Sequence, residues 1–571
     1  MLQEKNIFTF KLGGEAGNGI MAAGLTFSKL ATRSGYYIFN YTEYPSLIRG
    51  GHNVMQTSIS TSPVFSQYSS TDFLIALNQE TLELHKSELS PSSRVLYDSS
   101  INIHPDSLPC KSYAIPLTEI VKKANGSMIM RNAAALSAAI TLLGGSLEIF
   151  SELLDEELGG KKELVRDMNH RIIDIAKTYI QENYLDDIAD TLKVLLDIKP
   201  QIVTTGNDAA ALGALQGGMS FFSVYPMTPT SNIMHYLAPL QKDYNFIYKQ
   251  PEDEISAINM AIGASFAGAR SMVATSGGGF CLMSEGYGLA GITETPIVII
   301  EGMRGSPATG LPTWTEQGDL RFVLHAHQGD FPRIVLAPGD TTEVFKCVAD
   351  AFNLADIYQC PVVVLLDKYL CESHLSTPPF TYPEYAINRG KFTTEKQEDF
   401  SRYASSPDGI STRSIPGSGN FMLANSDEHD NTGYSIEDSK TRIVQMQKRM
   451  QKLKTCEQAH MQPPILYGDP AAPITVVSWG SNKGPIVEAL KQVDHVNFLQ
   501  ITWLNPFPAS SVTSYLKKSK HIVNLECNYS AQLAGLIREK TGINITDNFL
   551  KYDGRPFYPE EIVKKLNSLK F

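Results

Sequence analysis

Short apolar strands alternate with Gly- and Ala-rich helices in three stretches of this chain, and this alternation limits its fold more than any other feature. The first stretch, about residues 1–190, opens with a strand at 6–12, a glycine-rich turn and an amphipathic helix that ends at Gly35. The stretches at about 200–375 and 466–571 repeat the alternation. Because strand–helix–strand units form parallel sheets covered by helices, the pattern predicts an α/β protein with three parallel-sheet domains.

Residues 376–465 break this pattern. They are polar and rich in turn residues, and they end in a charged helix, "EDSKTRIVQMQKRMQKL". Long segments of this kind in a compact chain are usually functional or linking. We therefore expect a linker or excursion between the second and third domains, within a chain of 571 residues that is too long for one core.

Composition excludes several classes of protein. The net charge of −11 weighs against non-specific binding to nucleic acid. Seven cysteines occur without a C-x-x-C pair, so we expect no zinc ion or iron–sulfur cluster held by this chain, and a reducing compartment. The first residues lack a signal-peptide layout, and no apolar run reaches the ~18 residues of a membrane span. A cytoplasmic protein without membrane or nucleic-acid partners is expected.

The segment "SVYPMTPTSN" carries a candidate site at the end of a strand. Two prolines fix the backbone around Thr228, and Thr230 or Ser231 is placed to cap the next helix. Ligands of open α/β sheets bind beyond the carboxyl ends of strands. A rigid turn with a helix cap explains the same residues without a ligand.

Two further loops of the second domain carry charged candidates. In "PEDEISA" three acids open a helix, which the helix dipole favours, and Glu254 precedes a tightly packed apolar stretch. A carboxylate buried there needs a partner, and a ligand ring nitrogen would serve. Arg304 follows a strand in a Gly/Pro-rich loop and suits a carboxylate, or else is a solvated loop residue. Thr228, Glu254 and Arg304 all follow strands of one predicted sheet. We therefore expect them to converge on one crevice.

The first domain offers weaker candidates. "GGEAGNG" is a strand-to-helix turn that either presents backbone N–H groups to an anion or is a packing turn. Its spacing does not match the dinucleotide-binding pattern. In "YPSLIRGGHN", Arg49 is followed by two glycines, and it is either a ligand contact or an exposed arginine.

These segments together resemble the 2-oxoacid:ferredoxin oxidoreductases, and specifically an alpha subunit with a gamma domain fused at its N-terminus. "VYPMTPTSN" and the stretch from "EDEISAINMAIG" to "ITETPIVI" resemble the domain that binds the thiamine pyrimidine. "GGEAGNG" and "YPSLIRGGHN" resemble the gamma domain, and "WGSNKGPIVEAL", "NPFP" and "ECNYSAQLAGLIRE" resemble a transketolase-C-like domain. The segment "RSIPGSGNFMLANSDEHDNTGYS" most resembles the 2-oxoglutarate branch of the family.

The resemblance implies thiamine diphosphate chemistry with coenzyme A as co-substrate. Glu254 matches the glutamate that bonds the aminopyrimidine ring nitrogen, and Tyr225 and Pro226 are implied as further cofactor contacts. Thr228 and Arg304 match residues that hold the substrate. Arg49 and Ser46 are implied to contact coenzyme A or the distal substrate carboxylate.

The resemblance also implies partner proteins, because this chain lacks a diphosphate–magnesium motif and a cysteine cluster. Mg²⁺ and a [4Fe–4S] cluster are expected in a beta subunit, without which the chain would be inactive. An α₂β₂ assembly that reduces ferredoxin is implied.

Three departures from the family pattern put the substrate in question. Met227 stands where the family usually has an isoleucine, Gly278 where it has a proline, and Trp314 where it has a polar residue. All three are in loops near the expected pocket. The resemblance implies oxidative decarboxylation of 2-oxoglutarate to succinyl-CoA. The alternatives are the same chemistry on pyruvate or a branched-chain 2-oxoacid, and a non-catalytic scaffold subunit.

Overall fold

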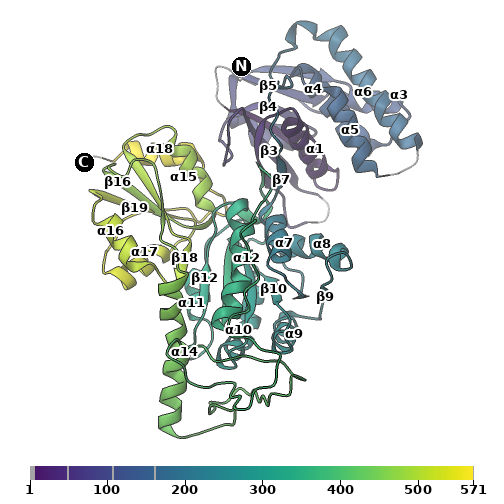
Figure 1. The fold of residues 1–571 in the computed structure, drawn as a ribbon. Helices are drawn as coiled ribbons and strands as arrows, with labels where there is room; N and C mark the ends of the chain where they lie inside the picture. Colours follow the sequence, from purple (N-terminus) through teal and green to yellow (C-terminus); the bar gives the residue numbers. More distant parts are fainter. Residues whose placement is uncertain (1–6, 48–49, 106–107, 160–162, 570–571) are drawn as a thin grey trace. The chain divides into compact units, whose positions relative to one another are not determined.

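The computed structural model describes residues 7–47, 50–105, 108–159 and 163–569, and the chain divides into two compact units. Figure 1 shows their helices and strands in sequence colours. Unit 1 takes three segments of the chain: Met1–Thr204, Ser373–Pro379 and Tyr558–Lys564. Unit 2 takes the others: Thr205–Glu372, Phe380–Phe557 and Lys565–Phe571.

Unit 1 is built on an eight-stranded sheet of mixed direction, in the order β6-β5-β4-β1-β3-β2-β14-β7. Strands β6, β5, β4 and β1 are parallel, as predicted, whereas β3, β2, β14 and β7 continue the sheet through antiparallel pairs. The bounds are β1 (Phe8–Glu15), β2 (Tyr37–Glu43), β3 (His52–Ser60), β4 (Thr71–Ala76), β5 (Leu89–Asp98), β6 (Lys111–Ile115), β7 (Ile202–Thr204) and β14 (His374–Thr377).

One core joins this sheet to its helices. Phe10 of β1 stacks on Phe27 of α1 with ring centroids 3.6 Å apart, and Phe73, its register partner on β4, lies 5.9 Å away between ring centroids. The alanine-rich segment "RNAAALSAAITLLGG" contains α4, whose small side chains are almost all buried. The helices are α1 (Ile20–Arg33), α2 (Gln79–His85), α3 (Leu117–Lys123), α4 (Arg131–Leu142), α5 (Leu147–Leu158) and α6 (Glu163–Asn183).

Unit 2 contains a seven-stranded sheet in the order β18-β12-β13-β11-β10-β8-β9. Its neighbouring strands are parallel except for β18, which pairs antiparallel with β12. The bounds are β8 (Phe221–Ser223), β9 (Ile247–Lys249), β10 (Ser271–Thr275), β11 (Ile297–Met303), β12 (Ile334–Leu336), β13 (Pro361–Asp367) and β18 (Trp503–Asn505).

Helices cover both faces of this sheet, so its central strands are apolar along their length. On β11, Val298 and Ile300 face one core while Ile297 and Ile299 face the other. Every residue of β11 is buried. The helices are α7 (Gly206–Gln216), α8 (Ser231–Leu237), α9 (Glu254–Phe266), α10 (Gly277–Ile292), α11 (Leu320–His325), α12 (Thr341–Tyr358) and α13 (Lys368–Glu372).

A third, five-stranded sheet follows in unit 2, in the order β15-β17-β16-β19-β20. The apolar segment "VNFLQITWL" contains two strands, β17 and β18, which belong to different sheets. The chain changes sheets at Ile501 and Thr502, whose backbone groups bond to Ser478 and Ala337 respectively. The bounds are β15 (Ile465–Tyr467), β16 (Ile474–Ser478), β17 (Val496–Gln500), β19 (His521–Glu526), β20 (Asp547–Leu550), α15 (Lys483–Leu490), α16 (Ala509–Leu516) and α17 (Gln532–Thr541). Most of the last helix, α18 (Pro559–Asn567), belongs to unit 1.

Residues 380–438 form turns and loops, as the composition indicates, and lead into the long helix α14 (Ser439–Ala459) (Figure 1). Buried ion pairs hold both to the seven-stranded sheet's helices. Asp356 of α12 pairs with Arg270, Arg389 and Arg413 at 2.7–2.8 Å. Glu294, after α10, pairs with Lys448 and Lys452 of α14 at 2.7 and 2.6 Å.

The α/β class predicted from the sequence is confirmed. The boundaries of the four predicted segments stay a prediction. Among the described residues, no helix is both long and apolar enough to cross a membrane.

Candidate active site

Four neighbouring strands of the seven-stranded sheet deliver the candidate residues to one edge. Strands β9, β8, β10 and β11 are adjacent and parallel, so their carboxyl ends lie along the same edge. The loop after β8 carries Thr228, the segment after β9 leads to Glu254, and β11 runs directly into Arg304. This is the edge at which open α/β sheets bind ligands.

Thr228 and Arg304 are in direct contact. Nη1 of Arg304 donates a hydrogen bond of 2.8 Å to the backbone carbonyl of Thr228. This bond orients the guanidinium, which is half-buried, and burial lowers its pKa. Thr230 occupies the N-cap position of α8, as expected, but its hydroxyl donates to the Met227 carbonyl at 3.1 Å and makes no capping bond.

Glu254 is the first residue of α9, and its carboxyl group is buried. Asp253 caps the helix by accepting the Ser256 N–H at 2.7 Å, so capping does not use Glu254. The Glu254 side chain is 3% exposed, and its Oε1 has no hydrogen-bond partner among the described residues. Burial raises its pKa. A buried, unpaired carboxyl oxygen costs free energy unless a ligand supplies the partner.

Gly279, in the first turn of α10, allows this arrangement. A methyl group on Gly279 would lie 2.7 Å from Oε1 of Glu254 and would overlap the Thr275 hydroxyl. A methyl group on Gly278 would meet only Sδ of Met227, at 3.9 Å. Gly278 and Met227, two of the departures from the family pattern, are therefore neighbours, and the first turn of α10 lies between Met227 and Glu254.

The loop that starts at Arg304 is anchored at its far end. The Arg555 guanidinium lies 3.5 Å from the centre of the Trp314 ring, and the Thr315 N–H bonds to the Gly554 carbonyl at 3.1 Å. Gln317 N–H bonds to the Cys527 carbonyl at 2.6 Å. Trp314, the third departure, thus fixes the loop against the C-terminal part of the chain.

The remaining predicted site residues lie in two other places: the loop after β8 and the segment between β2 and β3. Tyr225 and Pro226 are half-buried in the loop after β8. Ser46 is exposed between β2 and β3, in unit 1. Arg49 lies outside the described residues.

Two buried acids near this edge escaped the sequence analysis. Glu301 belongs to β11, and Asp319 precedes α11. The signal for Glu301 was a glutamate at the end of the apolar run "TPIVII". Asp319 had no such signal, because an aspartate before a helix is ordinary.

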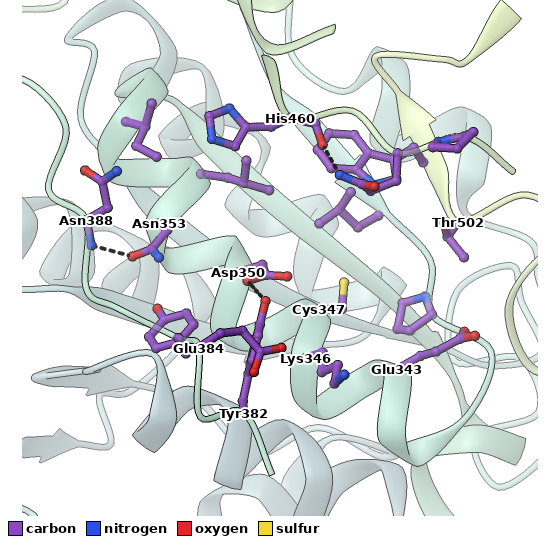
Figure 2. Close-up of a pocket in the computed structure, with 18 of the residues that line it drawn as sticks. Glu343, Lys346, Cys347, Asp350, Asn353, Tyr382, Glu384, Asn388, His460 and Thr502 are labelled. Atoms are coloured by element: carbon purple, nitrogen blue, oxygen red, sulfur yellow. Dashed lines mark hydrogen bonds between the residues drawn. The ribbon is translucent and has the colours of Figure 1, made fainter. Parts of the chain in front are cut away.

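A large cavity lies elsewhere in unit 2, along α12 (Figure 2). Its volume is about 880 Å³, and its lining does not include Thr228, Glu254 or Arg304. In Figure 2 the Tyr382 hydroxyl points to Asp350, to which it donates at 2.9 Å, and His460 lies across the cavity. The part of the chain that the structure describes holds no cluster of metal-ligating side chains.

Comparison with known proteins identifies the family. An alpha subunit of 2-oxoacid:ferredoxin oxidoreductase from Sulfolobus is 32% identical over 97% of this chain and 96% of the relative. The chain belongs to the 2-oxoacid:ferredoxin oxidoreductase family, as an alpha subunit. The subunit KorA of 2-oxoglutarate synthase from Methanothermobacter thermautotrophicus is 31% identical over 63% of the chain and 96% of its own length.

Comparison with solved structures supports the same family. A 2-oxoglutarate:ferredoxin oxidoreductase from Magnetococcus marinus, solved with 2-oxoglutarate, coenzyme A and succinyl-CoA bound, matches with a TM-score of 0.92 at 31% identity, over 99% of both chains. Residues 212–449 match the thiamine-diphosphate-binding domain model of pyruvate flavodoxin/ferredoxin oxidoreductases. Residues 9–179 match the pyruvate ferredoxin/flavodoxin oxidoreductase model. The family's alpha-subunit name implies further subunits.

The site of this oxidoreductase subunit fits thiamine diphosphate. The unpaired Oε1 of Glu254 offers a buried polar partner to a ring nitrogen, and the missing side chain of Gly279 leaves room for this carboxyl group. Both features belong to the matched thiamine-diphosphate-binding domain.

Proposed function

We propose that this alpha subunit oxidatively decarboxylates 2-oxoglutarate, with thiamine diphosphate bound between it and a beta subunit. The reaction converts 2-oxoglutarate, coenzyme A and two oxidised ferredoxins into succinyl-CoA, CO₂, two reduced ferredoxins and a proton. The support for this substrate is the similarity to the Magnetococcus enzyme and to the KorA subunit. Bound thiamine diphosphate supplies the nucleophilic carbon and the electron sink for decarboxylation.

The observation that carries the proposal is the unpaired Oε1 of buried Glu254. Because burial raises the pKa of this carboxyl, it holds a proton more readily than a solvated glutamate does. A glutamate in this state exchanges a proton with a ring nitrogen at Oε1. The helix cap at Asp253 and the close approach of Gly279 fix the position of the carboxyl group.

Arg304 and Thr228 are proposed to hold the substrate. The bond from Arg304 to the Thr228 carbonyl uses one guanidinium N–H and sets the plane of the group. The other N–H groups suit a bidentate contact with the substrate's carboxylate. The Thr228 hydroxyl is proposed to bind the 2-oxo group, while Tyr225 and Pro226 line the cofactor side.

The remaining parts of the enzyme are proposed to come from partners. A beta subunit would hold the diphosphate through Mg²⁺ and carry a [4Fe–4S] cluster that passes electrons to ferredoxin, in an α₂β₂ assembly. Ser46 and Arg49 are proposed contacts of coenzyme A or of the distal substrate carboxylate.

The test is anaerobic dye reduction by this chain co-expressed with its beta subunit, with 2-oxoglutarate and coenzyme A. Glu254→Ala is expected to lower the rate by about 100-fold or more, since a positioned proton-transfer group contributes at least that much. Glu252→Ala is the matched control, because Glu252 is an exposed acid two residues earlier. An unchanged rate in Glu254→Ala would favour a scaffold subunit.

Turnover of 2-oxoglutarate, pyruvate and 2-oxoisovalerate is compared in the same complex. A higher kcat/KM for 2-oxoglutarate is expected. Preference for either of the other acids would retain the mechanism and refute the proposed substrate.

A further inference from the structure

A chain of hydrogen-bonded side chains lies on the α2 face of the sheet in unit 1. His52 is the first residue of β3, His85 is the last residue of α2, and Glu88 ends the short helix η1 (Lys86–Glu88). Nε2 of His52 lies 2.9 Å from Nε2 of His85, and Nδ1 of His85 lies 2.8 Å from Oε1 of Glu88. The chain therefore runs from the end of β3 to a carboxyl group on a neighbouring element.

This carboxyl group is ionised. Glu88 pairs with Lys11 of β1, which is 4% exposed, and the Thr71 hydroxyl donates to Glu88 at 2.8 Å. Burial opposes the ionisation of Glu88, but the hydrogen bond from His85 and the charge of Lys11 lower its pKa to about 2. Glu88 is therefore a carboxylate at neutral pH and can only accept hydrogen bonds.

An ionised Glu88 determines which nitrogens of the two histidines carry hydrogen. Nδ1 of His85 is closer to Oε1 of Glu88, at 2.8 Å, than to Nζ of Lys11, at 3.3 Å, so Nδ1 carries the hydrogen and donates to the carboxylate. Because Lys11 already balances the charge of Glu88, a second cation at His85 is disfavoured, and Nε2 of His85 keeps its lone pair. His52 then donates from its own Nε2, which leaves a lone pair on Nδ1.

Nδ1 of His52 is thus an acceptor without a donor. The atom is buried, and it has no hydrogen-bond partner among the described residues. Burial, with the neighbouring His85 and Lys11, lowers the pKa of His52 to about 4, whereas Glu88 opposes this shift. The ring therefore stays neutral near pH 7, and its lone pair stays available. A buried acceptor costs free energy unless a ligand or a water molecule supplies the donor.

The backbone holds this ring in place. A methyl group on Gly13 of β1 would lie 3.0 Å from Cε1 of His52 and 2.5 Å from Cγ2 of Thr81, so the ring packs closely against the strand. The Ala16 N–H donates to the Gly51 carbonyl at 3.0 Å and ties the residue before His52 to the end of β1. The acceptor atom therefore has a fixed position, as a ligand contact requires.

We infer that Glu88 and His85 are positioning residues that hold His52 as a neutral acceptor, and that Nδ1 of His52 binds a hydrogen-bond donor of coenzyme A. This inference rests on the proposed function, in which Ser46, six residues earlier, contacts coenzyme A or the distal substrate carboxylate. A carboxylate offers only acceptors, whereas the arm of coenzyme A carries amide N–H groups and a thiol. The lone pair on His52 therefore selects coenzyme A.

The first measurement is magic-angle-spinning NMR of the complex with its beta subunit, labelled with [¹⁵N]histidine. The signals lost in His52→Gln assign His52. We expect a bare Nδ1 and a protonated Nε2 near neutral pH, and a shift of the Nδ1 signal on saturation with coenzyme A but not with 2-oxoglutarate. A protonated Nδ1, or a signal that coenzyme A leaves unchanged, would overturn the inference.

Desulfo-coenzyme A, which lacks the thiol, identifies the donor in the same spectra. A shift like that with coenzyme A would assign the bond to an amide N–H of the arm. A shift that occurs only with coenzyme A would assign it to the thiol. Either result supports an acceptor role for His52.

The second measurement is the affinity of the complex for coenzyme A, by calorimetric titration. His52→Gln retains a polar atom near Nε2 and removes the acceptor at Nδ1, whereas His52→Asn retains an acceptor near Nδ1 and loses the bond to His85. We expect about tenfold weaker binding in His52→Gln, as the loss of one hydrogen bond implies, and a smaller loss in His52→Asn. Equal affinities in the two variants would contradict the role of Nδ1.

Glu88→Gln tests the positioning role. Its amide can donate to Nδ1 of His85, which reverses both histidines and leaves a hydrogen on Nδ1 of His52. We expect this reversal in the NMR spectrum and about tenfold weaker binding of coenzyme A. Glu83→Gln, which removes an exposed acid of α2, should change neither. An unchanged tautomer in Glu88→Gln would refute the positioning role.

The measurements separate this inference from the proposed function. A complex that showed the expected shift with coenzyme A but turned over no 2-oxoacid would refute the proposed function and retain the role of His52. Normal turnover and unchanged affinity for coenzyme A in His52→Gln would refute the inference and leave the proposed function intact.

Discussion

At the scale of single residues, the site depends on groups that approach one another too closely for larger side chains. Gly279 brings α10 against Thr275 and Glu254, and Gly277 brings it against Asp319. At the middle position, Gly278, a methyl group would make only an ordinary contact with Sδ of Met227, at 3.9 Å. The three consecutive glycines therefore have different tolerances to substitution, although they look equivalent in the sequence.

Gly279→Ala tests this difference. The added methyl group would displace the Glu254 carboxyl, and overpacking of this kind costs about 1–3 kcal/mol. We expect thiamine diphosphate to bind about tenfold or more weakly to the complex, measured by calorimetric titration. Gly278→Ala is the matched control and should bind the cofactor normally. Equal affinity in the two variants would contradict the proposed position of Glu254.

The sequence predicted that Glu254, Thr228 and Arg304 belong to one site. Each follows a strand, and the topology of a parallel sheet brings such positions to one edge. It did not predict that Arg304 bonds to the Thr228 carbonyl, because a backbone acceptor has no residue signature. Nor did it predict the contact between Gly279 and Glu254, which depends on the distance between two helices.

At the scale of elements, buried ion pairs attach the irregular segment and α14 to the central sheet. The sequence predicted a charged helix here, and in the structure Lys448 and Lys452 of α14 are buried against Glu294, with Arg402 nearby. Charge alone could not reveal this, because the partner acid lies about 150 residues earlier in the chain.

Glu294→Gln should release this attachment. Removing one member of a buried ion pair costs about 3–5 kcal/mol, since the remaining charges stay desolvated. We expect a lower free energy of unfolding, and faster hydrogen exchange in 380–438 and α14 than elsewhere in unit 2.

Glu539→Gln provides the control, because Glu539 pairs with Arg321 and Lys540 at the surface. Such exposed pairs contribute at most about 1 kcal/mol. Similar effects of the two substitutions would show that the Glu294 pairs do not hold α14.

At the scale of the whole molecule, unit 1 is discontinuous in sequence. Strand β14 pairs with both β2 and β7, and the Ser376 hydroxyl accepts the Ile38 N–H at 2.8 Å. The alternation of strands and helices predicted the class of this unit. It could not predict β14, because a four-residue strand after a distant domain carries no signal of its partner.

The fragment 1–204 should therefore be less stable than the same fragment joined by a flexible linker to 373–379. Without β14 the edge of β2 is unpaired, and exposed edges favour aggregation. We expect a lower Tm, by about 2–4 °C for each kcal/mol lost, and more light scattering on heating. Identical melting of the two fragments would show that β14 is dispensable.

The position of β14 in the sequence also determines when the sheet of unit 1 can be completed during translation. Translation adds about 5–20 residues per second, so β14 is made roughly 10–30 s after the first segment of unit 1 ends at Thr204. Throughout that interval the nascent sheet has an open edge at β2 while the strands of unit 2 are being made. A gene split after Thr204 would leave the first product with an unpaired edge at β2, and the second product would carry β14 without its partners β2 and β7.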